Sequence, residues 1–192
     1  MPAAVKALIL LALAALTGLA AAKKKPSAPL GSKLIFQWVE MEHCPETFDM
    51  NATYELRYMR NGDVFADTTF HVRKPAQTIT KLRQIITSCT EAGAECEHFM
   101  TWDSPMEGCA FISAKHAVWS PTFVNIKPPF LCPIATGLYV NNNWTVDKNL
   151  LNLLPFPRNH LYKDRVEMWN EKNELFWCFI FHLIFKLYKP RT

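Results

Sequence analysis

Apolar and polar side chains alternate along much of this 192-residue chain from residue 33 onward. The clearest case is LFWCFIFHLIFKLY (175–188), which a period of two divides into two faces. One face holds Trp177, Phe179, Phe181, Leu183, Phe185 and Leu187, and the other holds Cys178, His182 and Lys186. The stretch is shorter than the roughly 20 apolar residues of a membrane-spanning helix. It therefore predicts a long strand with one strongly apolar face.

Similar strand patterns recur between turn signals. Asn61-Gly62 separates two alternating runs, which is a strong short-range signal for a β-hairpin. LRQIITSC (82–89) favours a strand, although QTITKLRQII also fits a short helix. The other predicted strands are KLIFQWVE (33–40), YELRYMR (54–60), DVFADTTFHV (63–72), GLYV (137–140) and RVEMW (165–169), the last joined to the final strand by NEKN. Many short strands of this kind predict an all-β sandwich or cup.

One stretch is rich in alanine and favours a short helix. GCAFISAKHAVW (108–119) ends at Ser120-Pro121, where the residue before proline is biased away from helical dihedrals. We expect the helix to stop at that point.

The amino terminus has the pattern of a secretory signal peptide. Lys6 precedes the apolar run ALILLALAALTGLA, and small residues up to Ala22 follow it. A membrane anchor is the alternative, but the run is too short to span a bilayer. The sequence thus predicts a signal peptide (1–22), a basic tail (23–32) and a single domain (33–188).

All six cysteines follow the predicted signal peptide. An even number of cysteines in a secreted chain indicates three disulfides, although the pairing stays open among fifteen connectivities. Sequons at Asn51 and Asn143 agree with the same route and predict glycosylation. We expect a secreted, extracellular protein, with the lysosomal lumen as another destination on that route.

Charge argues against nucleic acid as a partner. The formal net charge is +4, and Lys6 and Lys23 to Lys25 carry much of it. Without these residues the predicted domain is close to neutral, whereas nucleic-acid surfaces need clustered lysine and arginine.

No arrangement of residues predicts catalysis. The chain lacks Gly-x-Ser-x-Gly, His-Glu-x-x-His and a glycine-rich phosphate loop. Cys89, Cys96 and His98 have the composition of a metal site, but a disulfide beside a surface histidine is the simpler interpretation. Asp103 and Glu107 fit a solvated loop better than a carboxylate pair. Each of the six histidines is expected to be an ordinary surface or core residue. We therefore expect no enzyme activity, no metal and no cofactor.

Several apolar residues fall in a segment with loop character. Leu150, Leu151, Leu153, Leu154 and Phe156 lie around two prolines in NLLNLLPFPRNHLY. Loops usually lie on the surface, so an apolar one is expected to cover the mouth of a cavity or to meet a partner or membrane surface. One hypothesis is a lipid-binding protein, and the other is a protein-interaction module that docks through an apolar patch at 151–157.

Particular motifs resemble the ML lipid-recognition superfamily. They are Trp-Ser-Pro-Thr-Phe (119–123), Pro-Pro-Phe-Leu-Cys-Pro-Ile (128–134) and Gly-x-Tyr (137–139). Within that superfamily the chain is most similar to the ganglioside-activator-like group and its secreted arthropod relatives. FQWVEMEHC (36–44), Cys89 and Cys96 followed by Glu-His-Phe, and Cys178 extend the resemblance over about residues 33–185.

The resemblance implies an immunoglobulin-like β-sandwich or β-cup of two antiparallel sheets, whose apolar cavity holds acyl chains without covalent chemistry. It implies pairing of Cys44 with Cys178, Cys89 with Cys96, and Cys109 with Cys132; a fourth disulfide of the ganglioside activator is absent. It also implies a lipid or other long-chain hydrophobic ligand, transient contact with a membrane surface, and a hydrolase, receptor or chemosensory role downstream. The expected cavity or mouth residues are Trp119, Phe123, Phe130, Leu153, Leu154, Phe156, Phe179, Phe181 and Phe185.

Overall fold

The computed structural model describes residues 33–46, 49–104, 107–151 and 156–188, which belong to one compact unit. The predicted signal peptide (1–22) and basic tail (23–32) lie outside the described residues. Within the described ranges, no helix is both long enough and apolar enough to cross a membrane.

Strands make up most of the described part, which confirms the predicted all-β class. The strands are β1 (Lys33–His43), β2 (Met50–Tyr58), β3 (Val64–Val72), β4 (Ile79–Cys89), β5 (Glu97–Asp103), β6 (Ile126–Lys127), β7 (Gly137–Trp144), β8 (Leu161–Asn170) and β9 (Leu175–Tyr188). The helices are α2 (Gly108–Ser113), α3 (Ser120–Val124) and α4 (Lys148–Leu151). The stretch around 82–89 is part of β4, so the alternative of a helix there is excluded.

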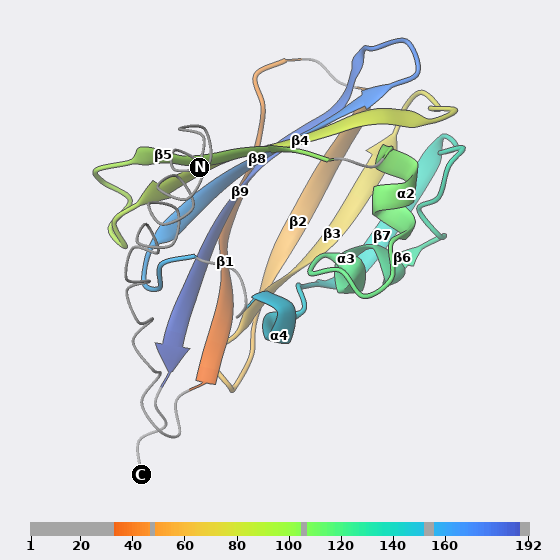
Figure 1. Ribbon diagram of the computed structural model, residues 1–192. Helices are drawn as coiled ribbons and strands as arrows, with labels where there is room; N and C mark the ends of the chain where they lie inside the picture. The colour runs from red at the N-terminus through yellow and green to blue at the C-terminus, as the bar shows by residue number, and fades with distance from the viewer. Residues whose placement is uncertain (1–32, 47–48, 105–106, 152–155, 189–192) are drawn as a thin grey trace, which may run out of the picture. The chain divides into compact units, whose positions relative to one another are not determined.

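The strands form one mixed, open sheet in the order β5-β4-β8-β9-β1-β3-β7-β6, with β2 paired to β3 (Figure 1). All pairs are antiparallel except β1 and β3, which meet in parallel through the pair Gln37–Val64. The sheet thus consists of two antiparallel runs, a first run β5-β4-β8-β9-β1 and a second run β2-β3-β7-β6. Among the described strands, the runs are joined only by this one pair. The resemblance implies two antiparallel sheets, and the β1–β3 pair joins the two runs into one mixed sheet.

The turns that the sequence predicts form as expected. Asn61 and Gly62 connect β2 to β3, where Gly62 has a φ of 89° and the Met59 N–H donates to the Asp63 carbonyl over 2.9 Å. Asn170 N–H donates to the Glu174 carbonyl and closes the β8–β9 hairpin over 3.0 Å. Glycine adopts a positive φ without steric strain, because it has no Cβ, and this explains why the turn forms at Gly62.

The core lies against one face of β9, as the alternation predicts. Trp177, Phe179, Phe181 and Phe185 are buried in the main apolar cluster, and Leu183 packs against it. On the opposite face, Cys178 is buried in a smaller cluster with Cys44. The side chains of successive residues point to opposite faces of a strand, so one strand contributes to both clusters.

The helical segment differs from its prediction. The predicted single helix is α2, which ends at Ser113, and a second helix, α3, begins at Ser120 instead of the chain leaving the helical region there. Pro121 lies in the first turn of α3, where its missing N–H costs nothing because no intrahelical acceptor would be available. Ser120 Oγ donates to the Ala114 carbonyl and accepts from the Ala117 N–H, which fixes the connection between the helices.

Contacts with the sheet determine where the helices lie. α2 and α3 lie next to each other, with α2 against β4 and α3 against β7, and α4 lies near β1 (Figure 1). Gly108 opens α2 directly on Ile79, and a Cβ at Gly108 would come within 2.2 Å of Ile79 Cγ2. A larger residue at 108 would therefore force α2 away from β4.

The six cysteines form three disulfides, with none left free among the described residues. The pairs are Cys44–Cys178, Cys89–Cys96 and Cys109–Cys132, the connectivity that the resemblance implies. Cys109–Cys132 ties α2 to the segment that precedes β7. Disulfides of this kind indicate that the chain folds in an oxidising compartment.

A buried carboxylate lies where the two antiparallel runs meet. Asp63 is 2% exposed; its Oδ1 accepts from the Phe36 N–H over 2.9 Å, and its Oδ2 lies 2.7 Å from Lys148 Nζ. Burial would raise the pKa of Asp63, but Lys148 and the Phe36 N–H outweigh it and hold the pKa below its ordinary value. Asp63 thus connects the β2–β3 turn, β1 and α4.

We expect Asp63→Ala to lower the free energy of unfolding by about 2–4 kcal/mol, because it leaves the buried Phe36 N–H without an acceptor. Urea unfolding at pH 7 measures this loss. The lowered pKa means that Asp63 stabilises the fold above its unfolded pKa of about 4, and that this contribution disappears as the pH falls further. The difference from wild type should therefore shrink in acid.

Asp103→Ala is the matched control, because Asp103 pairs with Arg83 on the exposed surface. Exposed ion pairs contribute little. Equal losses in the two variants would contradict the role assigned to Asp63.

Candidate functional site

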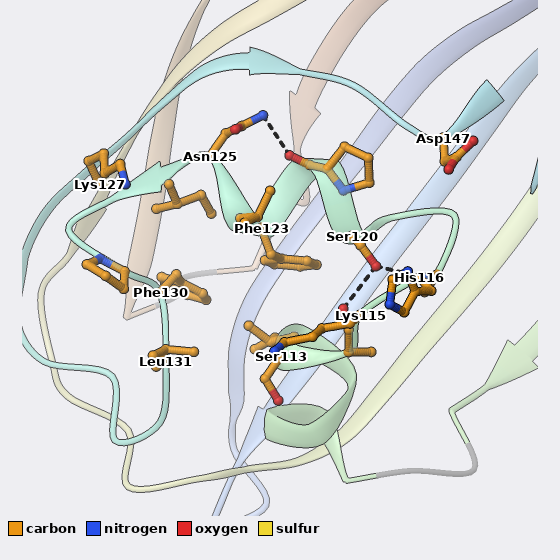
Figure 2. Close-up of a pocket in the computed structure, with 17 residues that line it drawn as sticks. Ser113, Lys115, His116, Ser120, Phe123, Asn125, Lys127, Phe130, Leu131 and Asp147 are labelled. Carbon is orange, nitrogen blue, oxygen red and sulfur yellow. Dashed lines mark hydrogen bonds between the residues drawn. The ribbon is translucent and has the colours of Figure 1, made fainter. Parts of the chain in front are cut away.

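A hollow of about 850 Å³ lies between the end of α2, the α2–α3 connection, α3 and residues 126–131. Its apolar wall includes Ile112, Phe123, Val124, Phe130 and Leu131. Figure 2 shows Phe123, Phe130 and Leu131 around this space, with Lys127 at one side and Lys115 and His116 at the other. We call this space the α3 hollow.

The floor of the α3 hollow separates it from the core. The rings of Phe123 and Phe130 lie nearly parallel, with centroids 6.4 Å apart. Together with Ile126, they also line a small internal void of about 10 Å³ whose far side is formed by Met50, Phe70, Trp144 and Trp177. Movement of these floor side chains would connect the hollow to the aromatic core.

The rim of the α3 hollow is polar and mostly cationic. Lys115, His116 and Lys127 are exposed at the rim. Asp147 also lines the hollow, but its Oδ1 accepts from the Asn149 and Leu150 N–H groups at the start of α4. The two lysines give this rim a positive character, which suits an anionic or strongly polar group outside an apolar interior.

The predicted cavity residues occupy different places. Phe123 and Phe130 line the α3 hollow. Trp119 lies beside it, with its ring stacked on Phe111 at 3.9 Å and its Nε1–H donating to the Phe111 carbonyl. Leu153 and Leu154 lie outside the described residues.

The remaining predicted residues lie in the packed interior. Phe179, Phe181 and Phe185 belong to the main core cluster. Phe156 packs against Phe99, with ring centroids 5.4 Å apart, and also contacts Tyr162 and Phe185. Phe156 is thus directed toward the core.

Sequence reasoning missed other residues of the α3 hollow, chiefly Val124, Leu131 and Lys115. Val124 and Leu131 are 71% and 53% exposed, which is unusual for apolar side chains of this size. Both directly follow predicted cavity residues, Phe123 and Phe130. This neighbouring position in the sequence was the available signal. It did not show that both pairs line the same hollow, because that depends on how the chain turns at 125–129.

One ionisable carboxylate lies on the inner face of β8. Asp164 falls between Tyr162 and Val166, both buried in the core, and opposite Phe181 of β9. Its Oδ2 accepts from Gln84 Nε2 over 3.1 Å, whereas Oδ1 is buried and has no hydrogen-bond partner among the described residues. Burial raises the pKa of Asp164 to about 7.

The groups that sequence reasoning set aside as metal-binding or catalytic have ordinary partners. Cys89 and Cys96 are joined, and His98 Nε2 lies 2.9 Å from Thr101 Oγ1. Asp103 receives two hydrogen bonds from the Arg83 guanidinium. His182 is different: it is buried next to two glutamates, an arrangement that the positions of these residues in the sequence did not indicate.

Both sequon asparagines are exposed. Asn51 lies on β2, and Asn143 lies near the end of β7, where its Oδ1 accepts from Arg57. Exposure is necessary for a glycan, and glycosylation of Asn51 and Asn143 stays a prediction.

Neither a protein-family model nor a curated protein sequence matches this chain. The similarity to the ML superfamily therefore stays an expectation, and the function has to be argued from the geometry of the α3 hollow.

We expect Asp164→Asn to remove a pH-dependent loss of stability. The unfolded carboxyl ionises near its ordinary pKa of about 4, whereas the folded one keeps its proton up to about 7. Between these values the folded state binds more protons, so wild-type stability falls as the pH rises, by at most about 4 kcal/mol. Urea unfolding at intervals from pH 4 to 8 should show a smaller decline in the variant. Parallel curves for the two proteins would contradict this position for Asp164.

Proposed function

We propose that the protein is a secreted, non-catalytic lipid-binding or lipid-transfer protein that takes up acyl chains through the α3 hollow. The observation that carries this proposal is the shared floor: Phe123, Ile126 and Phe130 line both the hollow and the aromatic interior. An apolar chain that enters the hollow is thus one layer of side chains away from the inner face of the sheet.

The size of the hollow supports a small-molecule ligand. Ligand pockets usually measure about 300–1,000 Å³, and the α3 hollow falls within this range. Burial of each methylene group contributes about 0.8 kcal/mol, so an acyl chain of a dozen carbons gains on the order of 10 kcal/mol before entropic costs. Apolar burial would therefore be the main driving force for binding, set against the entropic cost of association.

The rim supports a lipid with a polar end. Lys115 and Lys127 lie on different sides of the opening (Figure 2), where a head group would stay in water while the chain lies inside. A hydrolase or receptor could recognise the presented head group, and the same exposed apolar side chains would let the protein touch a membrane surface briefly.

The three disulfides support an extracellular or lysosomal setting, because paired cysteines persist in oxidising compartments. Secretion and glycosylation complete the proposal and rest on the amino-terminal pattern and the sequons.

A second candidate function is an extracellular protein-interaction module. The packing of the interior favours it, because the void behind Phe123 and Phe130 measures only about 10 Å³. In that case Val124 and Leu131 would dock a partner protein rather than guide a lipid chain. The two functions differ in whether a small ligand binds in stoichiometric amount.

The experiment is native mass spectrometry of the protein secreted from eukaryotic cells, followed by organic extraction and by uptake of offered fatty acids, glycolipids and sterols. We expect a stoichiometric mass increase that extracts as lipid. Val124→Glu places a carboxylate on the apolar wall of the hollow. It should reduce uptake by about tenfold or more, since a bound acyl chain would cover position 124 and desolvate that charge.

Leu138→Glu is the matched control, because Leu138 is 60% exposed on β7 and does not line the α3 hollow. It should leave uptake unchanged. A clean apo mass with no uptake of any offered lipid would refute the carrier function and favour the interaction module.

A further inference from the structure

A cluster of two carboxylates and one imidazole lies on the outer face of the β1–β9 pair. Glu40 is the cross-strand partner of His182, and Glu42 follows two residues later on β1. The pairing register shifts between Trp38 and Glu40. Because of this shift, Met41 packs in the core while Glu40 and Glu42 share the opposite face.

The donor atoms of this cluster are close together. His182 Nδ1 lies 3.5 Å from Glu40 Oε2, and His182 Nε2 lies 3.1 Å from Glu42 Oε1. One ligand atom from each residue can be chosen so that all lie within 4.8 Å of one another. The packed strands thus hold these groups at the spacing of a coordination sphere.

The histidine supplies a second observation that points to a ligand. His182 is only 5% exposed, yet its Nε2 is buried and makes no hydrogen bond with adequate geometry among the described residues. Buried polar atoms normally have a partner, and one without a partner in the described part calls for an explanation. The carboxylates of Glu40 and Glu42 are about half exposed, so an ion can reach the cluster from solvent.

We propose that Glu40, Glu42 and His182 form a binding site for Zn²⁺, with water completing the coordination. Zinc binds imidazole nitrogen and carboxylate oxygen at about 2.0–2.2 Å, so neighbouring donors of a tetrahedral site lie roughly 3.3–3.5 Å apart. The separation of His182 Nε2 and Glu42 Oε1 is already close to that value. If Nε2 binds the ion, Nδ1–H faces Glu40, which either orients the ring or binds through its other oxygen.

The chemistry of the donors selects the class of cation. Calcium and magnesium prefer six or more oxygen ligands, which two carboxylates and an imidazole do not provide. Burial lowers the pKa of His182, and the neighbouring Glu42 opposes that shift. Zinc binds the neutral form of an imidazole, through a ring nitrogen that carries no proton. Imidazole and carboxylate together suit Zn²⁺.

The positive charge of Lys163 disfavours the binding of a cation at this site. It is the β8 partner of His182 in the sheet register and its charge acts on the ring from the same face. The β9 residues next to His182 on this face, Ile180 and Ile184, carry no charge. Two carboxylates against one lysine leave the cluster net negative, and removal of the lysine charge should tighten zinc binding.

The site would also connect two strands. Glu42 and His182 belong to β1 and β9. The Cys44–Cys178 disulfide joins the same two strands, because Cys44 directly follows β1 and Cys178 lies on β9. An ion that binds only the folded arrangement stabilises it, so the melting temperature should rise with zinc concentration.

The test is isothermal titration calorimetry of the untagged, metal-free secreted protein with ZnCl₂ and, separately, CaCl₂. We expect one zinc ion per chain, weak or absent calcium binding, and a zinc-dependent rise in melting temperature. Glu42→Gln and His182→Asn should each weaken zinc binding at least about tenfold. Glu42→Gln alters only an exposed side chain, so it keeps the test decisive if His182→Asn misfolds.

Two further variants make the assignment specific. Lys163→Met should strengthen zinc binding, whereas His98→Asn, at an exposed histidine beside Thr101, should leave it unchanged. The absence of stoichiometric zinc binding would overturn the proposal. So would equal affinity for calcium, or zinc binding that Glu42→Gln leaves unaltered.

Discussion

The Asp63 carboxylate connects the parts of this fold that the sheet itself joins only weakly. The two antiparallel runs meet in parallel at Gln37 and Val64, directly beside Asp63. Its oxygens hold the backbone of β1 through Phe36 and the start of α4 through Lys148. A buried carboxylate persists because these donors replace the water that it loses. The junction of β1 with the β2–β3 turn thus rests on Asp63 as well as on the single parallel pair.

The proposed lipid site lies at the edge of the sheet formed by β6 and β7. β6 and β7 pair over only two positions, and the segment between α3 and β7 is tied to α2 by Cys109–Cys132. This arrangement leaves the α3 hollow open on one side and places Phe123 and Phe130 between it and the core. The proposed zinc site lies on the opposite face of β9 from the aromatic core, so the proposed lipid and ion would bind independently.

Local chemistry explains why much of the fold could be predicted. Asn61-Gly62 predicts its hairpin because glycine tolerates the positive φ of the turn. The period-two pattern of 175–188 predicts β9 and its core face because strand geometry needs no distant partner. The helix prediction was correct over 108–113 and wrong over 114–119, where His116 has a φ of 63° that a right-handed helix does not allow. A second helix then begins at Ser120, because proline is favourable in the first turn of a helix.

The sequence by itself determined most of the strands, the hairpins, the even set of cysteines and the apolar face of β9, because each depends on neighbouring residues. The strands β5 and β6 were not predicted. Only the tertiary structure decided which aromatic residues face a space: Phe123 and Phe130 line the hollow, while Phe179, Phe181 and Phe185 fill the core. It also decided that His182 meets Glu40 and Glu42, which lie far away in the chain. A one-residue register shift in β1 places those carboxylates, and alternation alone would have placed Glu40 on the core side with Phe36 and Trp38.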